Sequence, residues 1–229
     1  DPQGALKSSA EAAKSGVASA KVWQAATYAE LEDFSTAEQN WPADDLLRLT
    51  YFERVAIYLD QGRWAQAKTE SQRLQERAKG GDARLRQSQF PMAVALWASG
   101  DTDEARELLA RAVDTAMSAV EAPSSAMDQR DDATLALHAA LLLQRLGDGR
   151  AARRVTATLA GHPQLVAAQP VRALLAVADA RESLLKEDAA GAIATLDPIL
   201  DGTEPLQARV ALLEAKLMAG DASSALEQA

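Results

Sequence analysis

Apolar residues recur at steps of three and four along most of the chain, a spacing that places them on one face of a helix. The run that begins near residue 46 shows the pattern clearly, with Leu46, Leu49, Phe52, Val55 and Leu59 in register. Hydrophobic residues make up 48% of the chain and aromatic residues only 4%, and much of the apolar content is alanine. Alanine favours helix, whereas the residues that favour strands are sparse. The pattern therefore predicts an all-α protein.

A short turn separates these helical runs and recurs through the chain. Glycine followed by aspartate, with an alanine five residues after the glycine, occurs at Gly100, Gly147 and Gly220, and looser copies occur at Gly62 and Glu187. A glycine just past a helix supplies the left-handed residue that closes it, and the aspartate caps the next helix. The sequence thus predicts five helical hairpins in series, with turns near residues 62, 100, 147, 187 and 220.

Hairpins in series predict a solenoid over residues 43–229, in which each hairpin buries its apolar face against the next. Residues 1–42 are predicted to form a separate N-terminal helical segment. Trp41-Pro42 interrupts the helical pattern there, because proline disfavours helix in the residue before it. The chain begins with Asp1 and not with an initiator methionine. We therefore expect a piece of a larger protein, such as a bacterial multidomain protein.

The turn and its alanine resemble the tetratricopeptide repeat (TPR), in which two helices carry small residues where they cross. That family also has a small residue seven positions before the turn, and here those positions hold Val55, Ala93, Ala140, Ala180 and Leu213. The resemblance implies an α-α superhelix, a TPR-like solenoid of about five hairpins. The turns are 38, 47, 40 and 33 residues apart, whereas that family repeats every ~34 residues. A related array of irregular hairpins is therefore the alternative.

The resemblance also implies where a partner would bind, because in that family the first helix of each hairpin lines a concave groove. The predicted groove residues are Phe52, Leu59, Phe90, Val94, Trp97, Leu137, Leu141 and Gln144. Contiguous apolar surface of this kind suits an amphipathic helix or an apolar peptide. The alternative is that tight curvature, or the helices within residues 3–38, fill the groove and make these residues core.

Two clusters of arginine indicate a second surface. The first follows the turn at Gly62, and the second follows the turn at Gly147. The predicted basic flank consists of Arg73, Arg77, Arg84, Arg86, Arg150, Arg153 and Arg154. Arginine suits carboxylate pairing, so this flank is a candidate site for an acidic partner. The alternative is that these arginines lie on solvated helix faces.

Composition argues against several other kinds of partner. The chain has no cysteine, which rules out disulfides and sulfur metal sites and fits the cytoplasm while also allowing the periplasm. A net charge of -9 disfavours direct nucleic-acid binding. No apolar run approaches the ~18 residues of a membrane span. The single asparagine, Asn40, argues against the asparagine-lined peptide clamps of the family.

No catalytic constellation is recognisable in the sequence. The two histidines, His138 and His162, are far apart and have no cysteine near them. Asp131-Asp132 lies at a predicted helix start, where capping explains it. A glycine-rich phosphate loop is also missing. We therefore predict a protein that is not an enzyme, with no catalytic residue, cofactor or metal site.

Three hypotheses for function follow. The leading one is a non-enzymatic protein–protein interaction scaffold that binds a protein or peptide through the groove or the basic flank. The second is a regulatory domain that senses a small effector and controls an attached signalling or DNA-binding domain, as similar helical-repeat domains do in large bacterial regulators. The third is a self-associating spacer, for example a homodimer, that uses acidic ends and a more basic middle.

Overall fold

The computed structural model describes residues 1–17, 19–41, 50–77, 83–123, 125–202 and 204–223. Within these ranges the protein is built from 13 α-helices and one short 3-10 helix, and no residue lies in a strand. The prediction of an all-α protein is therefore confirmed.

The chain divides into two compact units, Asp1–Ala105 and Arg106–Ala229. The boundary predicted between residues 42 and 43 lies outside the described residues. The two units are described separately below as the first and the second unit.

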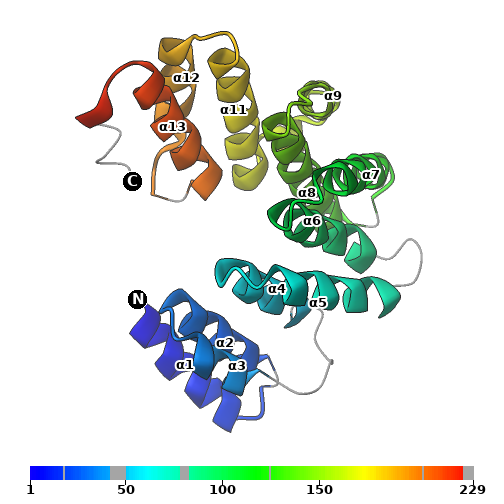
Figure 1. Cartoon of the computed structure of the whole chain (residues 1–229), viewed down its shortest axis with the longest axis vertical. Helices are drawn as coiled ribbons and strands as arrows, with labels where there is room; N and C mark the ends of the chain where they lie inside the picture. The colour runs from blue at the N-terminus through cyan, green and yellow to red at the C-terminus, as the bar shows by residue number, and fades with distance from the viewer. Residues whose placement is uncertain (18, 42–49, 78–82, 124, 203, 224–229) are drawn as a thin grey trace. The chain divides into compact units, whose positions relative to one another are not determined.

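The first unit contains six helices, and each hairpin packs its two helices against one another (Figure 1). The helices are α1 (Pro2–Lys14), α2 (Ala20–Glu30), α3 (Phe34–Asn40), α4 (Thr50–Asp60), α5 (Trp64–Arg77) and α6 (Ala83–Ala98). Helix α6 continues through Pro91 without a break. A buried cluster of Val55, Tyr58, Ala67 and Ala95 joins α4, α5 and α6, and Leu59 packs against it.

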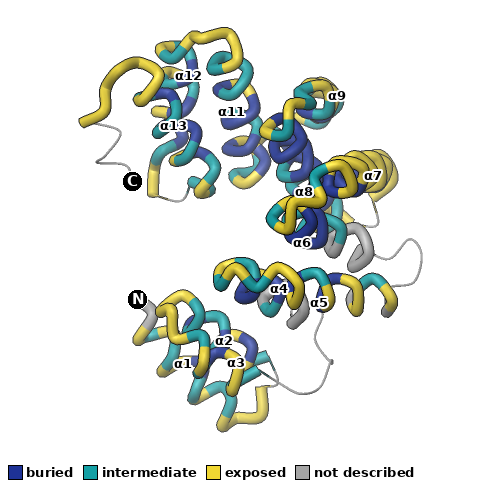
Figure 2. The backbone as a smooth tube through the Cα atoms, viewed as in Figure 1, coloured by how far each residue is buried: buried dark blue, intermediate teal, exposed yellow. Residues whose placement is uncertain are grey.

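The second unit holds the remaining helices, apart from the first four residues of α7. They are α7 (Thr102–Glu121), α8 (Ala126–Arg145), α9 (Arg150–Leu159), α10 (Pro163–Val166), α11 (Gln169–Leu184), α12 (Ala189–Leu196), the 3-10 helix Asp197–Ile199 and α13 (Leu206–Met218). Helix α8 packs against α9, α10 and α11, and α11 also packs against α12 and α13. Buried residues are accordingly dense along α8 and α11 (Figure 2).

One turn recurs in both units. In each copy, a residue with positive φ donates its backbone N–H to the carbonyl three residues earlier, and the next residue donates to the carbonyl five residues before it. This pair of bonds is the Schellman motif, which closes a helix C-terminus. Among the described residues it occurs at Gly16, Glu32, Gly62, Gly100, Gly147, Glu187 and Gly220. The turn thus lies at each of the five positions expected from the sequence and at two more in the N-terminal segment.

Small buried residues flank five of these turns, seven positions before and five positions after the left-handed residue. They are Ala25, Ala37, Val55, Ala67, Ala93, Ala105, Ala140, Ala152, Ala180 and Ala192, and each is at most 2% exposed. Since the separation of packed helices depends on the side chains at the contact, small residues here allow the two helices of a hairpin to approach closely. Ala25 and Ala37 around Glu32, a turn not expected from the sequence, have the same spacing and burial, which supports the same hairpin geometry.

The number of helices is larger than five hairpins and one helical segment would require. Residues 2–40 form three helices because Gly16 and Glu32 each end a helix. A further short helix, α10, follows His162, and Pro163 and Pro170 stand at the starts of α10 and α11. Proline is favoured in the first turn of a helix, so Pro163 and Pro170 mark the starts of these two helices.

Candidate functional site

The predicted groove residues of α6 form a partly exposed apolar stripe on the first unit. Phe90 and Val94 are half-buried and Trp97 is 41% exposed. Their i, i+4, i+7 spacing places them on one face of the helix. Ala93, at the edge of this face, and Leu96, on another face of the helix, are fully buried. We call Phe90, Val94 and Trp97 the α6 stripe.

Two further predicted groove residues, Phe52 and Leu59, belong to the first unit. Leu59 is half-buried because it packs against the cluster that joins α4, α5 and α6. The side chain of Phe52 lies outside the described part of the structure.

Three predicted groove residues of the second unit lie in its interior. Leu137 and Leu141 are buried, and so is Gln144. Helix α8 packs against α9, α10 and α11, and its buried residues run from Asp132 to Gln144. Gln144 donates from Nε2 to Glu182 on α11 at 3.4 Å, an interaction inside the unit. These residues therefore act as core of the second unit, as in the alternative interpretation of the apolar pattern.

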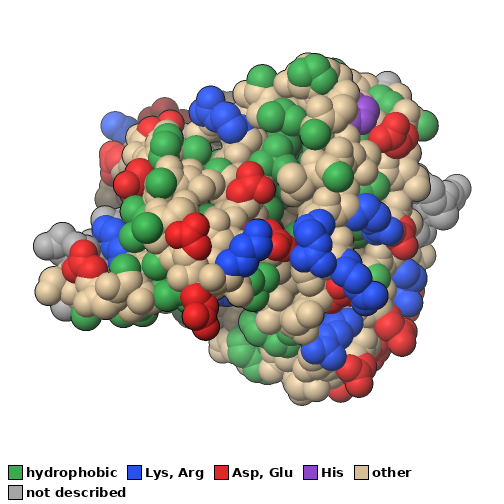
Figure 3. Space-filling view, turned by 90° about the horizontal axis from the view of Figure 1, so that it is seen from above, with side chains coloured by type: hydrophobic (Ala, Val, Ile, Leu, Met, Phe, Trp, Pro, Cys, Tyr) green, Lys and Arg blue, Asp and Glu red, His purple; other side chains and the backbone are tan. Residues whose placement is uncertain are grey.

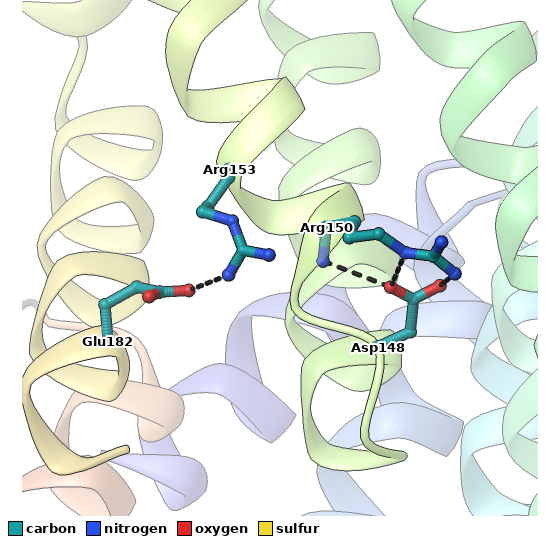
Figure 4. A network of polar contacts seen from close by, with 4 residues as sticks. All are labelled: Asp148, Arg150, Arg153 and Glu182. Carbon is teal, nitrogen blue, oxygen red and sulfur yellow. Dashed lines mark hydrogen bonds and ion pairs between the residues drawn. The ribbon is translucent and has the colours of Figure 1, made fainter. Parts of the chain in front are cut away.

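The arginines of the predicted basic flank that belong to the second unit are all paired with acids of that unit. Arg153 Nη1 lies 3.0 Å from Glu182 Oε1, and Arg150 Nε lies 3.1 Å from Asp148 Oδ1 (Figure 4). Arg154 pairs with Asp114 of α7. On the face drawn in Figure 3, Lys and Arg side chains gather with Asp and Glu side chains interspersed among them.

These ion pairs make the flank locally neutral. Hydrogen bonds from the side chain and the backbone of Arg150 lower the pKa of Asp148, so the carboxylate stays charged beside its arginine. An acidic partner would have to displace the internal carboxylates from these arginines. Since an exposed ion pair contributes only about 0–1 kcal/mol, the new pairs would add little binding free energy. The flank arginines of the second unit, Arg150, Arg153 and Arg154, therefore offer no excess positive charge.

The structure describes only part of the basic flank that belongs to the first unit. Arg73 Nη1 lies 2.6 Å from Glu70, a buried carboxylate of the same helix. The side chains of Arg77, Arg84 and Arg86 lie outside the described part of the structure.

A second ion-pair cluster joins three helices of the second unit. Glu214 of α13 accepts from Arg145 of α8 at 2.6 Å and pairs with Arg181 of α11 at 3.1 Å. Burial lowers the pKa of the Arg181 guanidinium, and Glu214 partly offsets that effect. Since Arg181 is only 13% exposed, this carboxylate neutralises a charge that would otherwise be poorly solvated.

The histidines lie in different settings. Burial lowers the pKa of His138 on α8, which favours its neutral form. His162 Nε2 lies 3.3 Å from Glu121 Oε1, so it joins the turn before α10 to the end of α7. Within the described ranges, no group of three or more His, Asp or Glu side chains is placed to hold a metal ion.

The sequence interpretation missed two features. Trp23 of α2 and Trp64 of α5 are 50% and 36% exposed, and neither belongs to the predicted groove or the basic flank. A pocket of about 200 Å³ lies between α9 and α11. Its acidic residues, Asp179 and Glu182, are three positions apart in the sequence and so share a helix face, but no sequence pattern brings them next to α9.

Comparisons with known proteins leave the family open: no protein-family model, no curated protein and no solved structure matches this chain. In the part of the chain that the structure describes, no helix combines the length and apolar character needed to cross a bilayer.

Proposed function

We propose that the protein is a non-enzymatic interaction scaffold, a TPR-like helical repeat module that binds an apolar segment of a partner protein through the α6 stripe. The observation that carries the proposal is the exposure of Trp97 beside Phe90 and Val94 on one face of α6. Tryptophan is enriched at the energetic centres of protein interfaces, and an exposed apolar patch is a typical binding surface.

The recurring turn supports the repeat architecture in this proposal. Seven Schellman turns, five of them flanked by small buried residues, are what an array of similar helical hairpins requires. Such arrays bind partners on surfaces built from successive hairpins, without any chemical step.

The spacing of the stripe indicates the form of the bound segment. Side chains at i, i+4 and i+7 present a narrow apolar strip about two turns long. An amphipathic helix offers a matching strip, because its own apolar residues follow the same spacing. We therefore infer that the partner segment is a short amphipathic helix.

Selection from a displayed peptide library tests this function directly. We expect the selected peptides to carry apolar residues at helical spacing. Trp97→Ala should weaken their binding about 30-fold, the equivalent of the ~2 kcal/mol loss of an interface hot spot. Trp97→Phe should restore part of the affinity, because a phenyl ring keeps much of the apolar contact. Affinity can be measured by titration calorimetry.

Trp23→Ala is the matched control, because Trp23 is also exposed, at 50%, but lies on α2, away from the stripe residues in sequence. Its affinity for the same peptides should stay within about twofold of wild type, the scatter of surface substitutions. Selected peptides that bind Trp97→Ala as tightly as wild type would remove the basis of the proposal. So would a selection that yields no peptide.

A further inference from the structure

The pocket between α9 and α11 combines charged and apolar groups. Helix α9 contributes Arg153 and Thr156, and helix α11 contributes Asp179 and Glu182. The remaining lining residues are alanines: Ala152, Ala157 and Ala178. Polar groups thus stand beside methyl-sized side chains that leave room for an alkyl chain.

The two acids of this pocket differ in their partners. Glu182 Oε1 accepts from Arg153 at 3.0 Å (Figure 4). It also accepts from Gln144 at 3.4 Å. Asp179 makes no hydrogen bond or ion pair with any residue that the structure describes. Asp179 is an exposed residue, but partial burial of its carboxyl raises its pKa, and the charge of Glu182 raises it further. A carboxylate in this position is stabilised when a cation comes close.

A second pocket of the same unit provides the contrast. It has a volume of about 230 Å³, lies between α7, α8 and α9, and also contains two acids, Asp114 and Asp148. Each of these acids is paired with an arginine of α9, Asp114 with Arg154 and Asp148 with Arg150. The charged groups of that pocket therefore cancel, whereas Asp179, Glu182 and Arg153 leave one negative charge between α9 and α11.

We propose that the pocket between α9 and α11 binds an alkylguanidinium or alkylammonium group, with Asp179 as its counter-charge and the alanines around its alkyl chain. The Thr156 hydroxyl is a further acceptor for the N–H groups of the cation. A guanidinium suits the site best, because it pairs with a carboxylate through two parallel hydrogen bonds.

The volume limits the ligand to a small group. Pockets for drug-sized ligands span about 300–1,000 Å³, and one water occupies about 30 Å³. A cavity of about 200 Å³ therefore accepts the end of one side chain or a small amine, and it is too small for a nucleotide.

Titration of the full chain with n-butylguanidinium, n-butylammonium and neutral n-butanol, followed by amide NMR, tests the site. The two cations should shift the amides of residues 152–157 and 178–182 with millimolar affinity, and n-butanol should leave them unchanged. Equal shifts with n-butanol, or cation-induced shifts that avoid these residues, would overturn the proposal.

Variants separate a binding role of Asp179 from a structural one. Asp179→Asn should weaken the cations at least about fivefold, since it removes the counter-charge and keeps the shape. Asp148→Asn, in the neutral pocket, should leave their affinity unchanged. Arg153→Gln should tighten binding severalfold, because it removes the competing cation, and a purely structural role of Asp179 predicts no such gain. Wild-type affinity in Asp179→Asn would end the proposal.

A further binding measurement with two ligands distinguishes two sources of this cation. The blocked peptide acetyl-Ala-Ala-Arg-Ala-Ala-amide represents an arginine of a partner protein, and n-butylguanidinium represents a free small effector. Tighter binding of the peptide assigns the site to a partner's side chain, and tighter binding of the free cation assigns it to an effector. The site shares no residue with the α6 stripe, so its failure would leave the peptide-binding proposal standing, and the reverse also holds.

Discussion

The two units have different side-chain chemistry. All four tryptophans, all three tyrosines and all three phenylalanines lie within residues 1–105, and residues 106–229 contain none of them. The second unit instead has an aliphatic core of Leu, Val, Ile and Ala, with ion pairs between its helices. Aromatic side chains are therefore confined to the first unit.

The same turn and the same small buried residues occur in both units, for example at Gly62 and at Gly147. The hairpin therefore does not depend on aromatic packing, because backbone hydrogen bonds and closely packed alanines are sufficient for it. Three of the four tryptophans are also at least 36% exposed. Exposed tryptophans are thus not needed for the hairpin, whereas Tyr58 belongs to the buried cluster of the first unit.

Leu174→Ala has the largest expected effect on stability and tests whether the two units unfold independently. Leu174 is 1% exposed in the second unit, so the truncation should lower the free energy of unfolding by about 2–5 kcal/mol. Circular dichroism should report this loss. Tryptophan fluorescence, which arises only from the first unit, should keep its wild-type midpoint. Equal shifts of both signals would show that the units unfold as one.

Glu214→Gln tests the contribution of ion pairs to the second unit. The change removes the acceptor charge that Arg145 and Arg181 share. We expect a loss of about 2 kcal/mol, below the 3–5 kcal/mol of a fully buried pair because Glu214 is partly exposed. Denaturation in urea at low and high salt measures it. An unchanged midpoint at low salt would mean that aliphatic packing alone holds α8, α11 and α13 together.

Gly62→Ala and Gly147→Ala test whether the turn is independent of the surrounding core. Both glycines have left-handed backbone, with φ of 68° and 93°. A side chain in that conformation costs about 1 kcal/mol, and we expect a similar loss in both units. Fluorescence follows the first variant and circular dichroism the second. A much larger loss at Gly62 would indicate that the added methyl group also disturbs the ring of Trp64, whose nearest atom lies 3.5 Å from a Cβ at that position.

The helices and their turns could be predicted largely from sequence, because both depend on local patterns. Turns at Gly62, Gly100 and Gly147 follow from glycine next to an apolar helical run. The turn at Glu32 was missed, although Glu32-Asp33 followed by Ala37 repeats the pattern of Glu187-Asp188 and Ala192. A glutamate at the left-handed position is a weaker signal than glycine, because glycine adopts that conformation far more readily.

The candidate site could not be predicted in the same way, because its contacts join distant parts of the chain. Arg154 looks unpaired in the sequence, since its acid, Asp114, lies forty residues earlier. Leu137 and Trp97 both fit the groove pattern, but neighbouring helices bury one and leave the other exposed. Periodicity identifies an apolar face, and only the tertiary contacts decide whether something covers it.

Glu187→Gly and Glu32→Gly are expected to have the smallest effect on stability. They should stabilise the protein, whereas Gly62→Ala and Gly147→Ala should destabilise it. Both glutamates have positive φ, at 62° and 60°. Glycine removes a strain of about 1–2 kcal/mol but adds entropy to the unfolded chain, so we expect a net gain of about 0.5 kcal/mol in each unit. Thermal unfolding of matched Glu→Ala variants is the control, because alanine keeps the strain and should give no gain. A loss of stability with glycine would mean that the glutamate side chains themselves stabilise these turns.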